Sequence, residues 1–170
     1  MNHFTTGLTK ALSVFLIILM AVMVLDVSWQ VFTRFVLKDP SSFTEELAGF
    51  LLIWIGLLGA SYAYYTRAHL GIDILTGKLS GVNRRIVEMV IHGIVFLFSL
   101  FIPLIGGYRL VSLTFTLNQI SPALGISMGY IYLVLPLSGI LLMYYSIYFI
   151  RGILGGVDIE SGEHKIRGVD

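Results

Sequence analysis

The chain has 170 residues, of which 56% are apolar and 12% are charged, and its formal net charge is +1. Its mean hydropathy of +0.88 lies far from the balance of soluble proteins, in which about a quarter of the residues are charged. The absence of cysteine excludes disulfides, thiolate metal sites and cysteine-ligated iron–sulfur clusters, and no basic face suits nucleic acid. We therefore predict an all-α integral membrane protein with a single membrane domain, residues 1–170.

The first predicted span covers about residues 8–36. Its apolar run resembles the core of a signal peptide, but it continues past Val27 without a small-x-small cleavage pattern, so we predict an uncleaved helix. Asp26, Gln30 and Arg34 follow at intervals of four and lie on one face of that helix, where the carboxylate can pair with the guanidinium. We interpret them as a polar contact for helix packing or for a partner subunit. The alternative is a proton or ion relay at Asp26.

The second predicted span covers about residues 43–66 and is the clearest of the four. Its twenty uncharged residues, 47–66, at about 1.5 Å each match a hydrocarbon core of roughly 30 Å. Ser42 and Glu45 fit the capping-box pattern at its start. Small residues recur along one stripe and predict close packing, either inside this chain or against a large partner subunit. They are Gly49, Gly56, Ala60 and Ala63.

The connection after the second span is the most basic part of the chain. Residues 71–79 show helical spacing of apolar residues, which predicts a short amphipathic helix in the membrane interface. His69 and Asp73 stand four apart, but two further ligands of a metal site are missing, so we interpret them as a local hydrogen bond. The basic side chains are expected to meet anionic lipid headgroups. They are Arg67, Lys78, Arg84 and Arg85.

The second half of the chain holds two further predicted spans, residues 82–108 and 126–150. Pro103 predicts a kink in the third span, which is expected to extend as an amphipathic segment over 110–120. We interpret His92 as a hydrogen-bonded structural residue; an axial haem ligand would need a second histidine at matching depth. The tail 152–170 is expected to be mobile.

The distribution of Lys and Arg predicts that both termini lie inside. The inner segments then hold eight of these residues and the outer segments hold three. With this orientation the outer face presents the turn at 37–46 and the segment 109–125.

The motifs of enzymes are missing. The sequence has no Gly-x-Ser-x-Gly, no His-Glu-x-x-His, no phosphate-binding glycine loop and no cluster of carboxylates, so we predict neither an enzyme nor a cofactor. A transporter that acts alone is poorly supported, because the midplane sections of all four spans are largely apolar. The remaining class is a membrane scaffold or accessory subunit.

Three blocks of sequence carry a resemblance to a known family. The run from Arg34 to Leu51, the block from His69 to Asp73 and the block from Ser121 to Tyr130 occur in this order. Together they resemble the small membrane (Q) subunit of TRAP transporters, the tripartite ATP-independent periplasmic family. The resemblance covers roughly residues 20 to 145.

The resemblance implies a division of labour among three proteins. A large multi-helix membrane subunit of the same transporter would move the substrate by a sodium-driven elevator motion. A soluble periplasmic substrate-binding protein would deliver it, and the substrate would be an organic acid such as sialic acid or a four-carbon dicarboxylate. This chain would bind neither substrate nor sodium, and would lie in the bacterial inner membrane as a scaffold among membrane lipids.

Within this picture the outer face is expected to dock the binding protein. The docking candidates are Lys38, Asp39, Glu45, Asn118 and Gln119. Two other functions stay open from the residues alone. A stand-alone four-helix proton-coupled transporter would depend on Asp26, and a haem-carrying membrane anchor would depend on His92.

Overall fold

The computed structural model describes residues 3–39, 41–67 and 81–155. The predicted helix at 71–79, the pair His69 and Asp73, and most of the predicted tail lie outside the described residues. Four helical segments are long and apolar enough to cross a membrane: His3–Leu37, Ser42–Tyr65, Asn83–Thr116 and Met128–Leu154. The predicted class, an all-α membrane protein with four spans, is confirmed.

The first segment consists of α1 (His3–Phe32) and the π-helical turn η1 (Thr33–Leu37). It ends at Lys38, whose backbone is left-handed (φ 57°) and whose N–H donates to the carbonyl of Thr33. The helix begins at His3, before the expected start at residue 8, so the polar lead of the chain is itself helical.

The second segment is α2 (Ser42–Tyr65), and its cap differs from the expected one. Ser41 is the N-cap: its backbone is extended, and its side chain accepts a hydrogen bond from the Thr44 N–H at 3.4 Å. The predicted capping box of Ser42 with Glu45 is therefore wrong. A cap residue needs a non-helical backbone, and Ser42 is already inside the helix.

The third segment joins α4 (Gly81–Ser99), the π-helical stretch η2 (Leu100–Gly106) and α5 (Gly107–Thr116). Pro103 lies inside η2. Proline lacks a backbone N–H and its ring collides with the preceding turn, and widened π-helical turns accommodate both defects. The segment therefore continues through the proline, and residues 110–116 extend it.

The fourth segment consists of α6 (Met128–Tyr132) and α7 (Val134–Leu154), so the first residues of the predicted tail are helical. Residues 117–127 connect α5 to α6, and we call them the outer loop. The loop is closed by hydrogen bonds from Gly125 N–H to the Ser121 carbonyl and from Met128 N–H to the Gln119 carbonyl, both 2.9 Å. Gly125 has φ +68°, a conformation that favours glycine.

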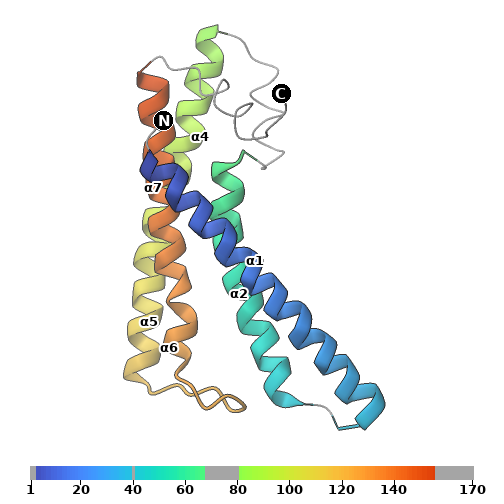
Figure 1. Ribbon diagram of the computed structural model, residues 1–170. Helices are drawn as coiled ribbons and strands as arrows, with labels where there is room; N and C mark the ends of the chain where they lie inside the picture. Colours follow the sequence, from blue (N-terminus) through green and yellow to red (C-terminus); the bar gives the residue numbers. More distant parts are fainter. Residues whose placement is uncertain (1–2, 40, 68–80, 156–170) are drawn as a thin grey trace, which may run out of the picture.

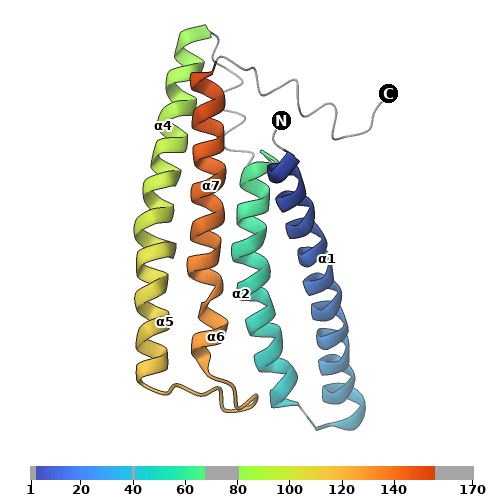
Figure 2. The ribbon, with the colours of Figure 1, turned by 60° about the vertical axis from the view of Figure 1, so that its left-hand side comes forward.

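The helices form two antiparallel hairpins that lie side by side. α1 packs on α2, α4 and η2 pack on α7, and α2 packs on α7 to join the hairpins. Figure 2 shows the resulting order across the molecule: α4 with α5, then α7 with α6, then α2, then α1. In Figure 1 the α1–α2 hairpin diverges from α5 and α6 toward the end that carries the α1–α2 turn.

This row of helices buries little of its own surface. In the most apolar window of each span, 17% of the residues are buried in three spans and 33% in the fourth, which contains α7. The core follows the seam around α7 and includes Leu12, Leu58, Val134, Tyr145 and Phe149. Most of the apolar surface thus remains open to lipid or to other subunits.

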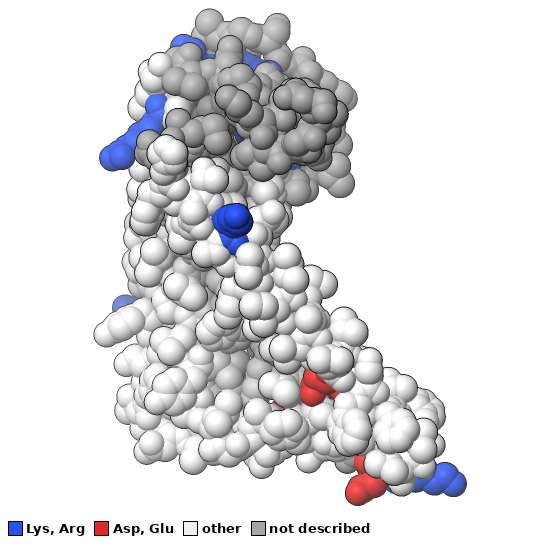
Figure 3. Space-filling model, viewed as in Figure 1, with Lys and Arg blue, Asp and Glu red and all other residues white. Residues whose placement is uncertain are grey.

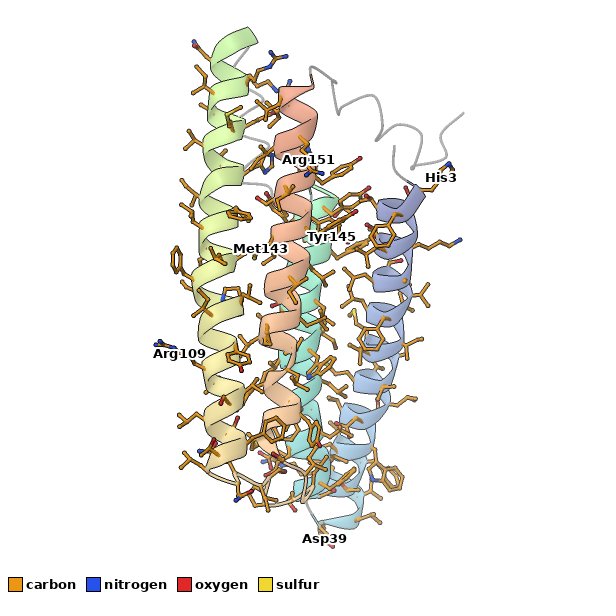
Figure 4. The ribbon with its side chains drawn as sticks, turned by 90° about the vertical axis from the view of Figure 1, so that its left-hand side faces the viewer. His3, Asp39, Arg109, Met143, Tyr145 and Arg151 are labelled. Carbon is orange, nitrogen blue, oxygen red and sulfur yellow. The ribbon has the colours of Figure 1, made fainter. Side chains whose placement is uncertain are left out.

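His3 and Arg151 lie at one end of the molecule and Asp39 lies at the other, as Figure 4 shows. An even number of spans places both described ends of the chain on one side. We call the end that carries Asp39 the outer end, after the predicted orientation.

Candidate functional site

The outer end brings together the residues that the sequence predicted for docking. Lys38 and Asp39 are exposed in the α1–α2 turn, and Glu45 is exposed in the first turn of α2. Asn118 and Gln119 are exposed at the start of the outer loop. In Figure 3 the visible acidic side chains lie toward this end, and a broad uncharged surface covers much of the adjoining face.

Glu46 connects the two halves of this end, a contact that its place near the start of α2 does not by itself indicate. Its Oε2 accepts hydrogen bonds from the Ser121 hydroxyl and from the N–H groups of Ala123 (3.1 Å) and Leu124 (3.4 Å). The Ser121 hydroxyl oxygen also accepts from the Leu124 N–H at 3.2 Å. A side chain of α2 thus binds the turn of the outer loop, which is closed by its own backbone hydrogen bonds.

Beside this contact lies an open hollow of about 330 Å³. Its lining comes from both hairpins: Ser42, Glu45, Glu46, Pro122 and Ala123. The hollow is shallow and carries one exposed carboxylate, that of Glu45, so it suits contact with a protein surface better than enclosure of a small molecule.

The predicted stripe of small residues lies on an open face of α2. Gly49, Gly56 and Ala60 are exposed and Ala63 is half-buried. A methyl group added at Gly49 or Gly56 would meet no atom of the described residues within 4 Å. Packing inside this chain therefore does not account for the stripe, which leaves its face free for a partner helix.

Close helix packing occurs instead in the second hairpin, at glycines to which the sequence analysis gave no packing role. A methyl group at Gly139 would lie 2.9 Å from the backbone nitrogen of Leu104. One at Gly107 would lie 2.8 Å from the Cβ of Leu135. No repeat in the sequence marks Gly107 and Gly139, because they lie on different helices. Each meets the opposite helix, at Leu135 and Leu104, only in the folded hairpin.

The predicted polar face of α1 does not form an ion pair. Asp26 is 8% exposed, and its Oδ2 has no hydrogen-bond partner among the described residues. Gln30 is half-buried and Arg34 is exposed, and the structure shows no hydrogen bond or ion pair from Asp26 to either of them. The expected pairing of Asp26 with Arg34 is therefore absent from the described part of the helix.

We call the end opposite the outer end the inner end. The basic residues predicted to meet lipid there differ in their contacts and exposure. The Arg67 guanidinium lies 5.3 Å from the ring centroid of Phe149, a cation–π contact, and its side chain is half-buried. Arg84 donates to Glu88 at 3.0 Å, and Arg85 is exposed. Lys78 lies outside the described residues. Arg85 is thus the described residue that best fits the predicted headgroup contact.

His92 is part of a buried polar cluster that joins three helices. Its Nδ1 lies 2.5 Å from the Tyr64 hydroxyl, and its carbonyl accepts from the Ser146 hydroxyl at 2.5 Å. Its ring stacks on Phe149 with centroids 4.8 Å apart. The hydrogen-bonded structural role is therefore present, and the packed ring leaves no open face beside which a haem could lie.

Comparison with known proteins complements this geometry. The family model of the DctQ component of tripartite ATP-independent periplasmic transporters matches residues 23–155. The sialic acid TRAP transporter small permease protein SiaQ of Vibrio cholerae is 29% identical over 126 residues, which are 74% of this chain and 71% of that protein. The C4-dicarboxylate TRAP transporter small permease protein DctQ of Rhodobacter capsulatus is 27% identical over 74% of this chain and 56% of its own length.

A third relative is a longer protein. The sialic acid TRAP transporter permease protein SiaT of Haemophilus influenzae is 31% identical over 119 residues, which are 68% of this chain and 18% of SiaT. A segment similar to this chain thus occurs within a larger permease polypeptide.

Proposed function

The chain belongs to the DctQ family of small TRAP transporter subunits, and we propose that it is the accessory scaffold subunit of a sodium-driven transporter that imports an organic acid. As a member of this family with four apolar spans, it is a multi-pass protein of the bacterial inner membrane. The observation that carries the proposal is the family match over residues 23–155.

A scaffold role fits the arrangement of the helices. In the most apolar window of each span, only 17% of the residues are buried inside the described chain in three spans and 33% in the fourth. A protein that moves substrate through itself needs polar groups that converge near the midplane. This chain instead offers wide apolar faces, which suit packing against a larger membrane protein.

The proposed partner in the membrane is a large multi-helix permease subunit of the same transporter. The similarity to part of SiaT supports this assignment, because a fused segment and a separate subunit can occupy the same place beside the large permease. The open stripe of Gly49, Gly56 and Ala60 is the face on which we place the contact, since small residues let two helix backbones approach closely.

The proposed partner outside the membrane is a periplasmic substrate-binding protein. We place its docking on the exposed residues of the outer end: Lys38, Asp39, Glu45, Asn118 and Gln119. The named relatives act on sialic acid and on a C4-dicarboxylate, which supports an organic acid as the substrate class.

Purification of the tagged full-length chain from its native membrane in mild detergent tests the proposal. We expect a large permease to co-purify, identified by mass spectrometry, and the reconstituted complex to take up its organic acid only with an inward sodium gradient. A lone homodimer whose activity depends on Asp26 would contradict the scaffold role and support the stand-alone transporter.

The variant Gly56→Leu tests the proposed contact face. A leucine on the open stripe separates the two helices, so we expect recovery of the large permease to fall about tenfold, equivalent to about 1.4 kcal/mol. Gly7→Leu is the matched control, because Gly7 is also an exposed helical glycine with no described atom near its added methyl. Full recovery with Gly56→Leu would place the contact elsewhere.

A further inference from the structure

We infer that Glu46 is a positioning residue that holds the outer loop against α2, so that the two parts of the outer end act as one docking surface. The inference rests on the proposed docking of a binding protein at this end. It concerns a residue that itself makes no predicted contact with that protein.

The contact has the geometry of an anion-binding site in which the anion is the Glu46 carboxylate of the same chain. One carboxylate oxygen accepts from the Ser121 hydroxyl and from two successive backbone N–H groups, those of Ala123 and Leu124. Ser121 is 1% exposed. Successive N–H groups in a turn form a concave site for an anion, and bonds to a carboxylate are stronger than bonds between neutral groups.

The contact also has a distinctive place in the fold. The other described side-chain hydrogen bonds from α2 across the seam to α6 and α7 start at Trp54, Ser61 and Tyr64, successively farther from the outer end. Among the described residues, Glu46 therefore makes the outermost side-chain hydrogen bonds between the two hairpins. Figure 1 shows the two hairpins diverging toward this end, where the Glu46 contact joins the start of α2 to the outer loop.

The predicted docking residues divide between the two sides of this link. Lys38, Asp39 and Glu45 belong to the α1–α2 hairpin, whereas Asn118 and Gln119 belong to the outer loop. The loop is closed by its own backbone hydrogen bonds, so without the Glu46 contact it would keep its shape but could shift relative to α2. A binding protein would then have to fix that position when it docks, and the cost would weaken its binding. With it, the loop is already in place.

Spin labels test the positioning role without any knowledge of the substrate. This chain has no cysteine, so Lys38→Cys and Pro122→Cys can carry nitroxides as its only thiols; Pro122 is exposed and lies beside the groups that Glu46 bonds. The labelled full chain is measured in nanodiscs together with a cysteine-free variant of its large permease. We expect a single narrow distance distribution, and its loss in both Glu46→Gln and Ser121→Ala. Glu45→Gln is the control, because it removes the neighbouring exposed carboxylate and should leave the distribution narrow. A narrow distribution in both Glu46→Gln and Ser121→Ala would overturn the inference.

Binding of the cognate binding protein to the same complexes, without labels, tests the consequence. We expect Glu46→Gln to weaken docking about tenfold, since a charged hydrogen-bond network is lost, and the double variant with Ser121→Ala to be no weaker. Glu88→Gln, at the opposite end of the molecule, is the control for loss of a carboxylate.

The two outcomes separate this inference from the proposed function. Unchanged docking of Glu46→Gln, when the unaltered complex docks, would overturn the positioning role alone. Failure of the unaltered complex to dock any binding protein would overturn the docking function, while the distance measurement would still decide whether Glu46 holds the loop.

Discussion

At the level of single residues, the carboxylates of Glu46 and Asp26 have different surroundings, although both lie in apolar helices. Glu46 is satisfied by three donors from the outer loop, whereas Asp26 is buried in α1 with an oxygen that lacks a described partner. Both were visible in the sequence as acids at or within a span. Only the positions of other chain segments distinguish them.

Asp26→Asn should therefore stabilise the purified protein or leave its stability unchanged. The amide has the same shape but no charge, and an unsatisfied buried polar atom costs about 1–3 kcal/mol, more when it is charged. Thermal unfolding in detergent measures the change, with the exposed Asp39→Asn as a control that should have no effect. A lower melting temperature for Asp26→Asn would mean that the Asp26 carboxylate has a stabilising partner.

Ser146→Ala should destabilise the protein. The Ser146 hydroxyl bonds both the Tyr64 hydroxyl (3.3 Å) and the His92 carbonyl (2.5 Å), so its loss leaves buried groups unpaired at a cost of about 1–3 kcal/mol. The same thermal unfolding measurement applies. Ser28→Ala is the control, because that exposed hydroxyl bonds only within its own helix and its loss should be neutral. Equal effects of the two substitutions would contradict a role for the cluster in joining the helices.

At the level of the helices, a glycine allows close packing in one hairpin and lies on an open face in the other. Gly139 allows α7 to approach the backbone at Leu104, whereas Gly49 lies on the open face of α2. Sequence spacing highlighted the α2 stripe because its small residues repeat on one helix. A close approach between two helices leaves no such repeat when each contributes one glycine.

Gly139→Ala should destabilise the chain by about 1–3 kcal/mol, because the added methyl would force backbone rather than a flexible side chain to move. Gly49→Ala should stabilise the isolated chain by up to about 1 kcal/mol, since alanine favours the helix. Unfolding in detergent compares the two. If Gly139→Ala were as stable as the unaltered protein, the η2–α7 contact would be looser than the structure shows.

At the level of the whole molecule, the row of helices leaves surfaces that only an assembly can cover. The outer end carries charges that should guide the encounter with a soluble partner more than they strengthen the final complex. Reversal of both charges, Lys38→Glu with Asp39→Lys, keeps the net charge and changes the local pattern.

This double variant should slow association of the binding protein by about tenfold at low salt and have little effect at high salt, where charges are screened. Stopped-flow experiments over a series of salt concentrations measure the association rate of the binding protein. Reversal of Arg85 to Glu, at the inner end, is the control for a charge change far from the docking surface. Association rates that did not depend on the variant at any salt concentration would remove these two residues from the docking surface.

The sequence alone determined the class, the four spans and the family, because each depends on a local property. Twenty uncharged residues fit a bilayer whatever surrounds them, and a family motif is a string of adjacent residues. The cap of α2 was misplaced by one residue, because Ser41 and Ser42 have the same side chain and only the backbone conformation selects between them.

Only the tertiary structure decided which polar groups meet. Glu46 and Ser121 are 75 positions apart, in two blocks that separately carry the family resemblance, and no spacing rule connects them. The same holds for His92 with Tyr64 and for Gly139 with Leu104. Helices in a bilayer are each specified by their own hydrophobicity, but their neighbours are chosen by packing and by hydrogen bonds between distant segments, which a linear pattern does not contain.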